Sequence, residues 1–136
     1  MKLEQQVTSL KLSKRLKELG VKQDSLFSWV KPKDKDVWVC WYYKELCRDE
    51  VKDWDDISAF TVAELGEKLP KEHQFYSYPM VLDGKDAWDC TSDNKNLFAD
   101  EGWEIGQSGM PPMFAKSEAN ARAKMLVYLI KNKIIK

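Results

Sequence analysis

Only one histidine and three cysteines occur among the 136 residues of this sequence. The cysteines, Cys40, Cys47 and Cys90, are odd in number, and no two of them are spaced as C-x-x-C. The first ten residues lack the apolar stretch of a signal peptide, and no apolar run approaches the ~20 residues of a membrane span. These absences predict a cytoplasmic protein that has no contact with a membrane and keeps its cysteines as free thiols.

Residues that could carry catalysis or hold a metal are also sparse. His73 lies in the polar stretch KEHQF, which indicates an exposed loop histidine rather than a base paired with a cysteine. The acidic stretches 49–56 and 83–93 do not have the spacing of a calcium-binding loop, and one histidine with three scattered cysteines matches no zinc-ligand spacing. We therefore expect no catalytic residue, no cofactor and no metal. An enzyme of unknown type is the third functional hypothesis.

What the sequence does have is apolar and aromatic content. Hydrophobic residues make up 43% of the chain, and six Trp, five Tyr and five Phe contribute large side chains. A disordered chain would lack this content. The length suits one ordinary domain, so we expect residues 1–136 to fold as a single domain.

The charges sum to zero but are unevenly distributed. Residues 1–35 and 113–136 are basic, whereas residues 36–112 carry seventeen Asp or Glu against seven Lys or Arg. One interpretation is that two basic terminal helices lie beside an acidic middle region. The alternative is that the two ends converge into a basic patch for nucleic acid or for an acidic protein.

Capping residues and hydrophobic spacing predict three helices. The first covers residues 9–19, with Thr8 or Ser9 as its N-cap and Gly20 after its end. The second begins at Thr61, has Glu64 at the capping-box position and ends at Pro70. The third covers residues 117–132, with Ser117 as its N-cap and a stripe of Ala119, Ala123, Leu126 and Ile130.

Strand signals lie between these helices. Residues 25–30 and 37–43 are rich in aromatic and β-branched side chains and predict a hairpin. Because both faces of 37–43 are apolar, we expect this strand to be central in its sheet and covered on both faces. Residues 74–82 and 85–91 flank Asp83-Gly84, which is a strong hairpin signal, and 97–98 and 103–105 are candidate short strands.

The predicted order is α-β-β-α-β-β-(β)-α. This order favours an α+β fold, in which a mostly antiparallel sheet has helices packed on it, over a doubly wound parallel sheet. A helix-turn-helix over residues 12–30 is the alternative for the N-terminal region. It is disfavoured because Leu16 occupies a position where such motifs need a small residue, and because SLFSWV prefers a strand.

Three strings in the sequence are similar to a known group of proteins: ELGVKQDSLFSWV, ISAFTVAELGEKLP and SEANARAKMLVYLIKNKII. They resemble small proteins that prophages and mobile elements of gut bacteria encode. In that group an aromatic-Thr segment leads into a short Ala-Glu-Leu helix, and an Ala-x-Ala-rich helix ends the chain. The resemblance implies a phage-related cytosolic origin and an α/β sandwich, and it favours the hairpin at SLFSWV. It implies no activity and no site residue.

The leading functional hypothesis is a non-enzymatic accessory protein that acts by binding a protein partner or a second copy of itself. An aromatic-rich sheet face or edge would make the contact, because Trp and Tyr are enriched at protein interfaces. The candidate partner-binding residues are Trp38, Trp41, Tyr43, Tyr76, Tyr78 and Trp88.

The second hypothesis is a nucleic-acid-associated regulator that uses the basic first helix. Its candidate residues are Lys11, Lys14, Arg15, Lys17 and Lys22, with Arg122 and Lys124 of the last helix as additions.

Overall fold

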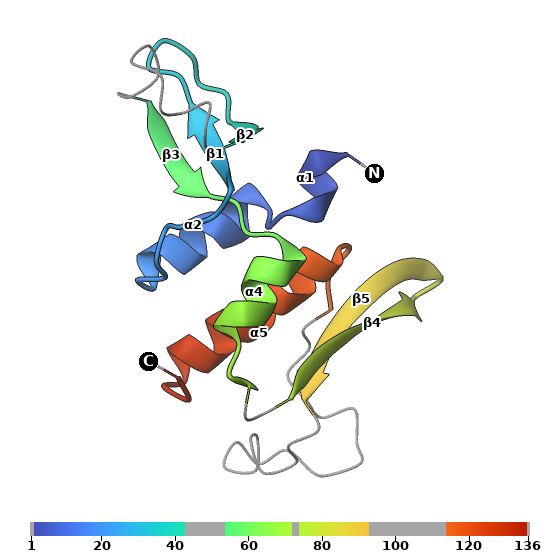
Figure 1. Cartoon of the computed structure of the whole chain (residues 1–136). Coiled ribbons are helices and arrows are strands. Elements are labelled where there is room, and N and C mark those ends of the chain that lie inside the picture. Colours follow the sequence, from blue (N-terminus) through green and yellow to red (C-terminus); the bar gives the residue numbers. More distant parts are fainter. Residues whose placement is uncertain (1, 43–53, 72–73, 93–113, 136) are drawn as a thin grey trace.

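The computed structural model describes residues 2–42, 54–71, 74–92 and 114–135 (Figure 1). The predicted α+β class is confirmed, since helices combine with antiparallel strands. The helices are α1 (Leu3–Gln6), α2 (Leu10–Glu18), α4 (Val62–Lys68) and α5 (Glu118–Lys131). The strands are β1 (Phe27–Lys31), β2 (Val39–Tyr42), β3 (Asp55–Ser58), β4 (Phe75–Leu82) and β5 (Lys85–Ser92).

The described strands form two separate sheets instead of one. In the first sheet the order is β2-β1-β3, and the second is the β4–β5 hairpin. Figure 1 shows the three-stranded sheet at one end of the molecule and the hairpin beside α5. Two elements of this fold, α1 and β3, are absent from the predicted order. The candidate strands at 97–98 and 103–105 lie outside the described residues.

The predicted caps and turns are in place. Ser9, Thr61 and Ser117 each accept a hydrogen bond from the backbone N–H three residues later, and Thr61 and Glu64 form a complete capping box. At the tip of the β4–β5 hairpin, Asp83 and Gly84 have φ values of 52° and 77°. Positive φ at both positions matches the right-handed twist of the two strands, which is why the Asp-Gly pair predicted this turn correctly.

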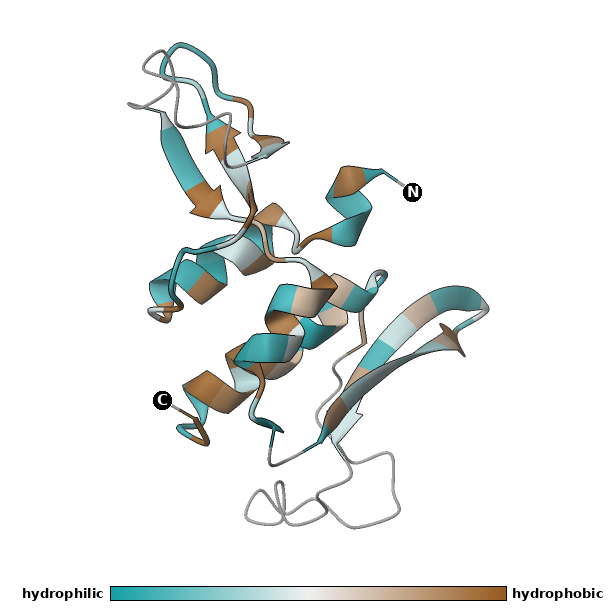
Figure 2. Ribbon diagram, in the orientation of Figure 1, coloured by the Kyte–Doolittle hydropathy of each residue, from teal (hydrophilic) through white to brown (hydrophobic). Residues whose placement is uncertain are grey.

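The main core lies where α2, α4 and α5 meet the hairpin. Its large buried side chains include Leu16, Phe60, Leu65, Met125 and Leu129. In Figure 2 the hydrophobic colour gathers on α5, while α2 is more hydrophilic. The predicted α5 stripe is correct at its alanines and at Leu126, whereas Ile130 is only partly buried. The small side chains of Ala119, Ala121 and Ala123 let the first half of α5 lie close to β5.

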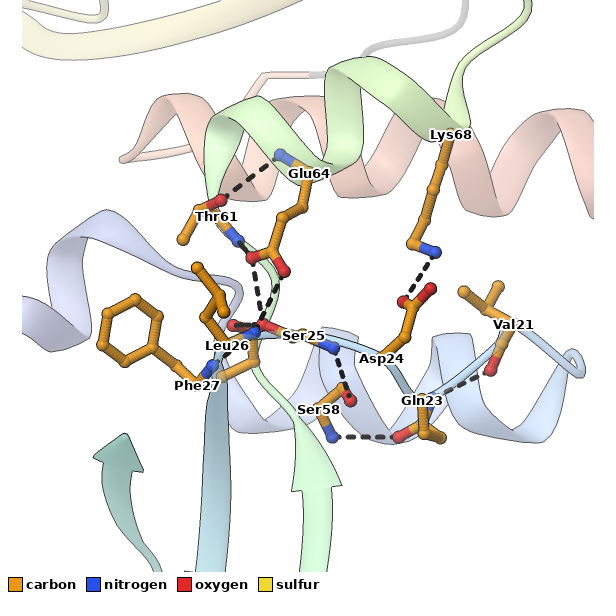
Figure 3. Close-up of polar contacts among 11 residues, drawn as sticks. Val21, Gln23, Asp24, Ser25, Leu26, Phe27, Ser58, Thr61, Glu64 and Lys68 are labelled. Atoms are coloured by element: carbon orange, nitrogen blue, oxygen red, sulfur yellow. Dashed lines mark hydrogen bonds and ion pairs between the residues drawn. The ribbon is translucent and has the colours of Figure 1, made fainter. Parts of the chain in front are cut away.

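Residues 21–26 form no helix, and β1 follows them directly, so the helix-turn-helix alternative is wrong. Hydrogen bonds hold this segment between β3 and α4 (Figure 3). Ser25 donates to the carbonyl of Ala59 or to the carboxylate of Glu64, and Gln23 accepts from the Ser58 N–H. A recognition helix would have to break these contacts. The strand preference of SLFSWV therefore prevails, as the hairpin prediction required.

The prediction that residues 37–43 form a central, covered strand is wrong for the described residues. β1 is the central strand and pairs with both β2 and β3, while β2 lies at the edge. Val39 and Tyr42 of β2 are exposed. On the central strand β1, Ser28 and Val30 are buried, and the other three residues are partly buried.

Candidate binding surfaces

The structure separates the predicted aromatic residues into several places rather than one surface. Trp38 lies just before β2, partly buried, and the ammonium groups of two lysines lie against its ring. Lys14 Nζ of α2 is 5.2 Å from the ring centroid and Lys31 Nζ of β1 is 5.9 Å from it. Both distances are within the range of a cation–π interaction. This arrangement places positive charge beside a tryptophan.

The other aromatic residues of the first sheet are divided between its two faces. Trp41 packs against the ring of Trp54, with centroids 5.2 Å apart. Tyr42 packs against Phe27 at 5.6 Å, and its side chain is exposed. Neighbouring residues of a strand point to opposite faces, so Trp41 and Tyr42 cannot contact one partner surface together. Tyr43 lies outside the described residues.

Tyr76 and Tyr78 form a pair on β4, and this is the most exposed aromatic surface of the described residues. Their ring centroids are 6.2 Å apart, and 43% and 40% of the two residues is exposed. Tyr78 Oη donates to Asp89 Oδ2 across the hairpin at 2.9 Å. By alternation Met80 and Leu82 share this face of β4. We call Tyr76, Tyr78, Met80 and Leu82 the tyrosine face.

Burial raises the pKa of Asp89 above its ordinary value, although its hydrogen bond with Tyr78 acts in the opposite direction. The pKa of Tyr78 is also raised, first by burial and then by Asp89. The phenol of Tyr78, whose pKa is raised, is the donor of this bond and Asp89 is its acceptor. The bond holds the Tyr78 ring in one position, so less side-chain entropy is lost when a partner contacts the ring.

Trp88 is on β5 and does not lie on the tyrosine face. It lines a groove of about 660 Å³ between α1 and the first turns of α4 and α5. Leu3, Phe27 and Val62 contribute apolar side chains to the same groove. Among the aromatic candidates within the described residues, Trp88 is the one that the structure places in a large concavity.

The basic candidates are likewise divided. Arg15 pairs with Glu18 at 3.2 Å, and Lys17 Nζ donates to the carbonyl of Asp56. Arg122 is largely buried and bonds to Ser77 and Glu118, so it contributes to the interior and not to a basic surface. Lys22 is exposed. Of these candidates, Arg122 is therefore the one that the structure separates from the basic residues of α2.

The two basic ends of the chain meet at a second groove, of about 840 Å³. Ser9 at the start of α2 donates its N–H to Asn120 Oδ1 of α5 at 2.8 Å, which fixes the two helices beside each other. Four lysines line this groove together with two aspartates and several apolar side chains. We call it the lysine groove; its charged residues are Lys11, Lys85, Lys116, Lys124, Asp83 and Asp86, and its apolar residues include Leu12, Leu82, Ala87 and Phe114.

The two described cysteines are poor nucleophiles. Burial raises the pKa of Cys40 to about 11 and that of Cys90 to about 12, and Arg122 beside Cys90 only partly opposes this effect. A thiol with such a pKa stays protonated at neutral pH. Cys47 and His73 lie outside the described residues. Within the described ranges, no group of three or more His, Cys, Asp or Glu side chains could hold a metal ion.

Sequence reasoning missed both the lysines at Trp38 and the lysine groove. Lys14 is far from Trp38 in the chain, and the four groove lysines come from four separate segments. The available signal was the basic character of the two chain ends, from which convergence was only the alternative interpretation and which did not show where the ends meet.

Comparison of the chain with protein-family models, with curated proteins and with solved structures finds no match. The relation to prophage proteins therefore stays a prediction. No helix in the described part of the chain is both long enough and apolar enough to cross a bilayer.

Proposed function

We propose that this chain is a cytoplasmic accessory protein of phage or mobile-element origin that acts by binding another protein or a second copy of itself. The observation that carries the proposal is the tyrosine pair of β4, which exposes two neighbouring aromatic rings on a regular strand. Tyrosine gives a large contact area with few rotatable bonds and is enriched at interfaces. The hydrogen bond of Tyr78 to Asp89 supports the proposal because it orients one ring in advance.

Self-association is tested by sedimentation velocity over a range of protein concentrations. Wild type is compared with the double variant Tyr76→Ser/Tyr78→Ser, in which the expected result is loss of concentration-dependent association. Tyr42→Ser is the matched control, because Tyr42 is 39% exposed but lies on the other sheet. A protein partner is tested in the same way, by comparing capture on immobilised wild type and on the two variants. Association that is unchanged in the double variant would remove the tyrosine face from the proposal.

A second candidate is a nucleic-acid-associated regulator, and the specific observation in its favour is the pair of lysines at Trp38. Proteins that bind single strands combine positive charge with an aromatic ring on which a base stacks. Trp38 is partly buried, so a base would reach only part of the ring.

The test is fluorescence anisotropy of labelled duplex and single-stranded DNA at low and moderate salt. Replacing Lys14 and Arg15 with glutamine should reduce the slope of log affinity against log salt by about 1 to 2, since each lost phosphate contact changes it by about 1. Lys71→Gln is the control, because Lys71 is exposed in the segment after α4 and is not part of the predicted set. If the slope does not change, the first helix does not bind the nucleic acid.

A further inference from the structure

The lysine groove has the size and the composition of a ligand site. Its volume of about 840 Å³ lies within the range of about 300–1,000 Å³ that is common for such sites. It lies between the start of α2, the tip of the β4–β5 hairpin and the segment that leads into α5. These elements are fixed to one another, because Ser9 bonds to Asn120 and Trp88 exchanges two backbone hydrogen bonds with Ala115.

The charge of the groove is positive. Lys11, Lys85, Lys116 and Lys124 contribute four positive charges, against two negative charges from Asp83 and Asp86. Within the described residues, none of these four lysines is within ion-pair distance of a carboxylate. Lys124 Nζ donates to the carbonyl of Phe114, which holds this ammonium group at the wall of the groove.

Apolar side chains line the groove together with the lysines. Leu82 at the end of β4 is 38% exposed, Leu12 of α2 is partly buried, and both line the groove. A ligand that matches this lining therefore combines a few separate negative charges with apolar groups. A nucleic-acid strand does not, because it carries a charge at every phosphate and would place some phosphates against Asp83 and Asp86. A peptide can place each carboxylate opposite a lysine and leave the other positions apolar.

We propose that the lysine groove binds an acidic, leucine-containing peptide segment of a partner protein. The lining of the groove includes neither tyrosine of the pair nor Trp38, but it shares Leu82 with the tyrosine face and Lys11 and Lys124 with the predicted nucleic-acid set. The proposal therefore names a partner chemistry for the proposed binding function, and it is tested through the lysines and not through the tyrosines. Asp83 and Asp86 would select against uniformly charged ligands, since like charges placed opposite each other weaken binding.

Lys11 provides the sharpest variant. It lies in the first turn of α2, where a glutamate favours the helix because it complements the helix dipole. Lys11→Glu is therefore expected to keep or improve the stability of the fold while it weakens binding. If Lys11 had only a structural role, the affinity for the peptide would fall only when the stability of the fold also fell.

The experiment uses the full chain and fluorescence anisotropy of a labelled peptide that alternates glutamate with leucine. We expect binding that weakens as salt rises, and an affinity about tenfold lower for Lys11→Glu and for Lys85→Glu/Lys116→Glu. Lys35→Glu is the matched control, because Lys35 is an exposed lysine in the loop between β1 and β2 and does not line the groove. Thermal unfolding confirms that each variant is folded.

Three results would overturn the proposal. The first is equal affinity of wild type and Lys11→Glu for the peptide. The second is equally tight binding of a peptide in which glutamine replaces glutamate, which would show that charge is not recognised. The third is tighter binding of single-stranded DNA than of the acidic peptide, together with a lower affinity for DNA in the same variants. That result would assign the groove to nucleic acid.

Discussion

The carboxylate of Glu64 caps its own helix and also binds Ser25, a residue in a different part of the fold. Its Oε1 accepts from the Thr61 N–H at 2.9 Å and from the Ser25 hydroxyl at 3.0 Å, and its Oε2 accepts from the Leu26 N–H at 3.1 Å (Figure 3). One side chain therefore completes the first turn of α4 and attaches the segment that leads into β1. It links the helical part of the molecule to the three-stranded sheet.

Replacement of Glu64 by alanine should lower the free energy of unfolding by about 2 kcal/mol, because it removes a helix cap and leaves the Leu26 N–H without its partner. Urea unfolding measures the change. Glu67→Ala is the control, since Glu67 is exposed on the same helix, and its effect should stay within about 0.5 kcal/mol. Equal losses in the two variants would show that only the charge of α4 matters.

Gly66 of α4 lies against the guanidinium of Arg122. A Cβ atom at Gly66 would be 2.8 Å from Arg122 Nη1, and this side chain cannot move without loss of its bonds to Ser77 and Glu118. Alanine in place of glycine normally stabilises a helix interior by about 1 kcal/mol. Here we expect Gly66→Ala to be destabilising in wild type and stabilising by about 0.5–1 kcal/mol in an Arg122→Ala background. A change of the same sign in both backgrounds, measured by urea unfolding, would contradict the contact.

The local elements could be predicted because the residues that form them are close in sequence. Ser9, Thr61 and Ser117 bond to backbone only three residues away, and Asp83-Gly84 forms its turn alone. No pairing across the chain is needed for these features. The helices α2, α4 and α5, the second hairpin and the α+β class follow from them.

The predictions that were wrong or incomplete depended on which segments lie together in space. The apolar character of Val39 and Trp41 indicated a central strand, but the centre goes to β1 because β3 pairs with it instead of with β2. β3 includes two exposed aspartates and has no strand-like composition, so only its pairing identifies it. The candidate surfaces were hidden for the same reason, since Lys14 reaches Trp38 only through the packing of α2.

The buried thiol of Cys90 makes stability depend on alkaline pH. Burial raises its pKa from the ordinary value of 9.0 to about 12, so the folded protein keeps this proton at a pH where the unfolded chain has lost it. Unfolding then releases a proton, and the free energy of unfolding falls as pH rises above about 9. The slope from this one group is at most about 1.4 kcal/mol per pH unit.

Urea unfolding between about pH 8 and about pH 10.5 tests this expectation. Lysines, tyrosines and Cys40 contribute equally to wild type and to Cys90→Ala, so the difference between the two proteins isolates Cys90. The stability of wild type should fall more steeply with pH than that of Cys90→Ala. Parallel curves would mean that the thiol is not buried in solution.

The backbone nitrogen of Pro79, at the middle of β4, points away from β5. The partner of Pro79 in the hairpin register is Trp88, and Trp88 directs both its N–H and its carbonyl to Ala115, on the other side. Pro79 therefore occupies a non-hydrogen-bonded position, where the missing N–H costs the hairpin nothing. Within the described residues β4 pairs with β5 alone, so the proline interrupts the row of donors along the outer edge of β4.

Pro79→Val should change the free energy of unfolding by no more than about 1 kcal/mol, because no hydrogen bond of the hairpin is lost and valine favours a strand. The same change restores a donor to the edge and should increase concentration-dependent association in sedimentation velocity. Adding Val81→Lys at the exposed position two residues along should reverse this gain, since an edge lysine opposes strand pairing. If Pro79→Val associates no more than wild type, the outer edge of β4 is protected by something other than its proline, and self-association would have to use the tyrosine face without adding a strand.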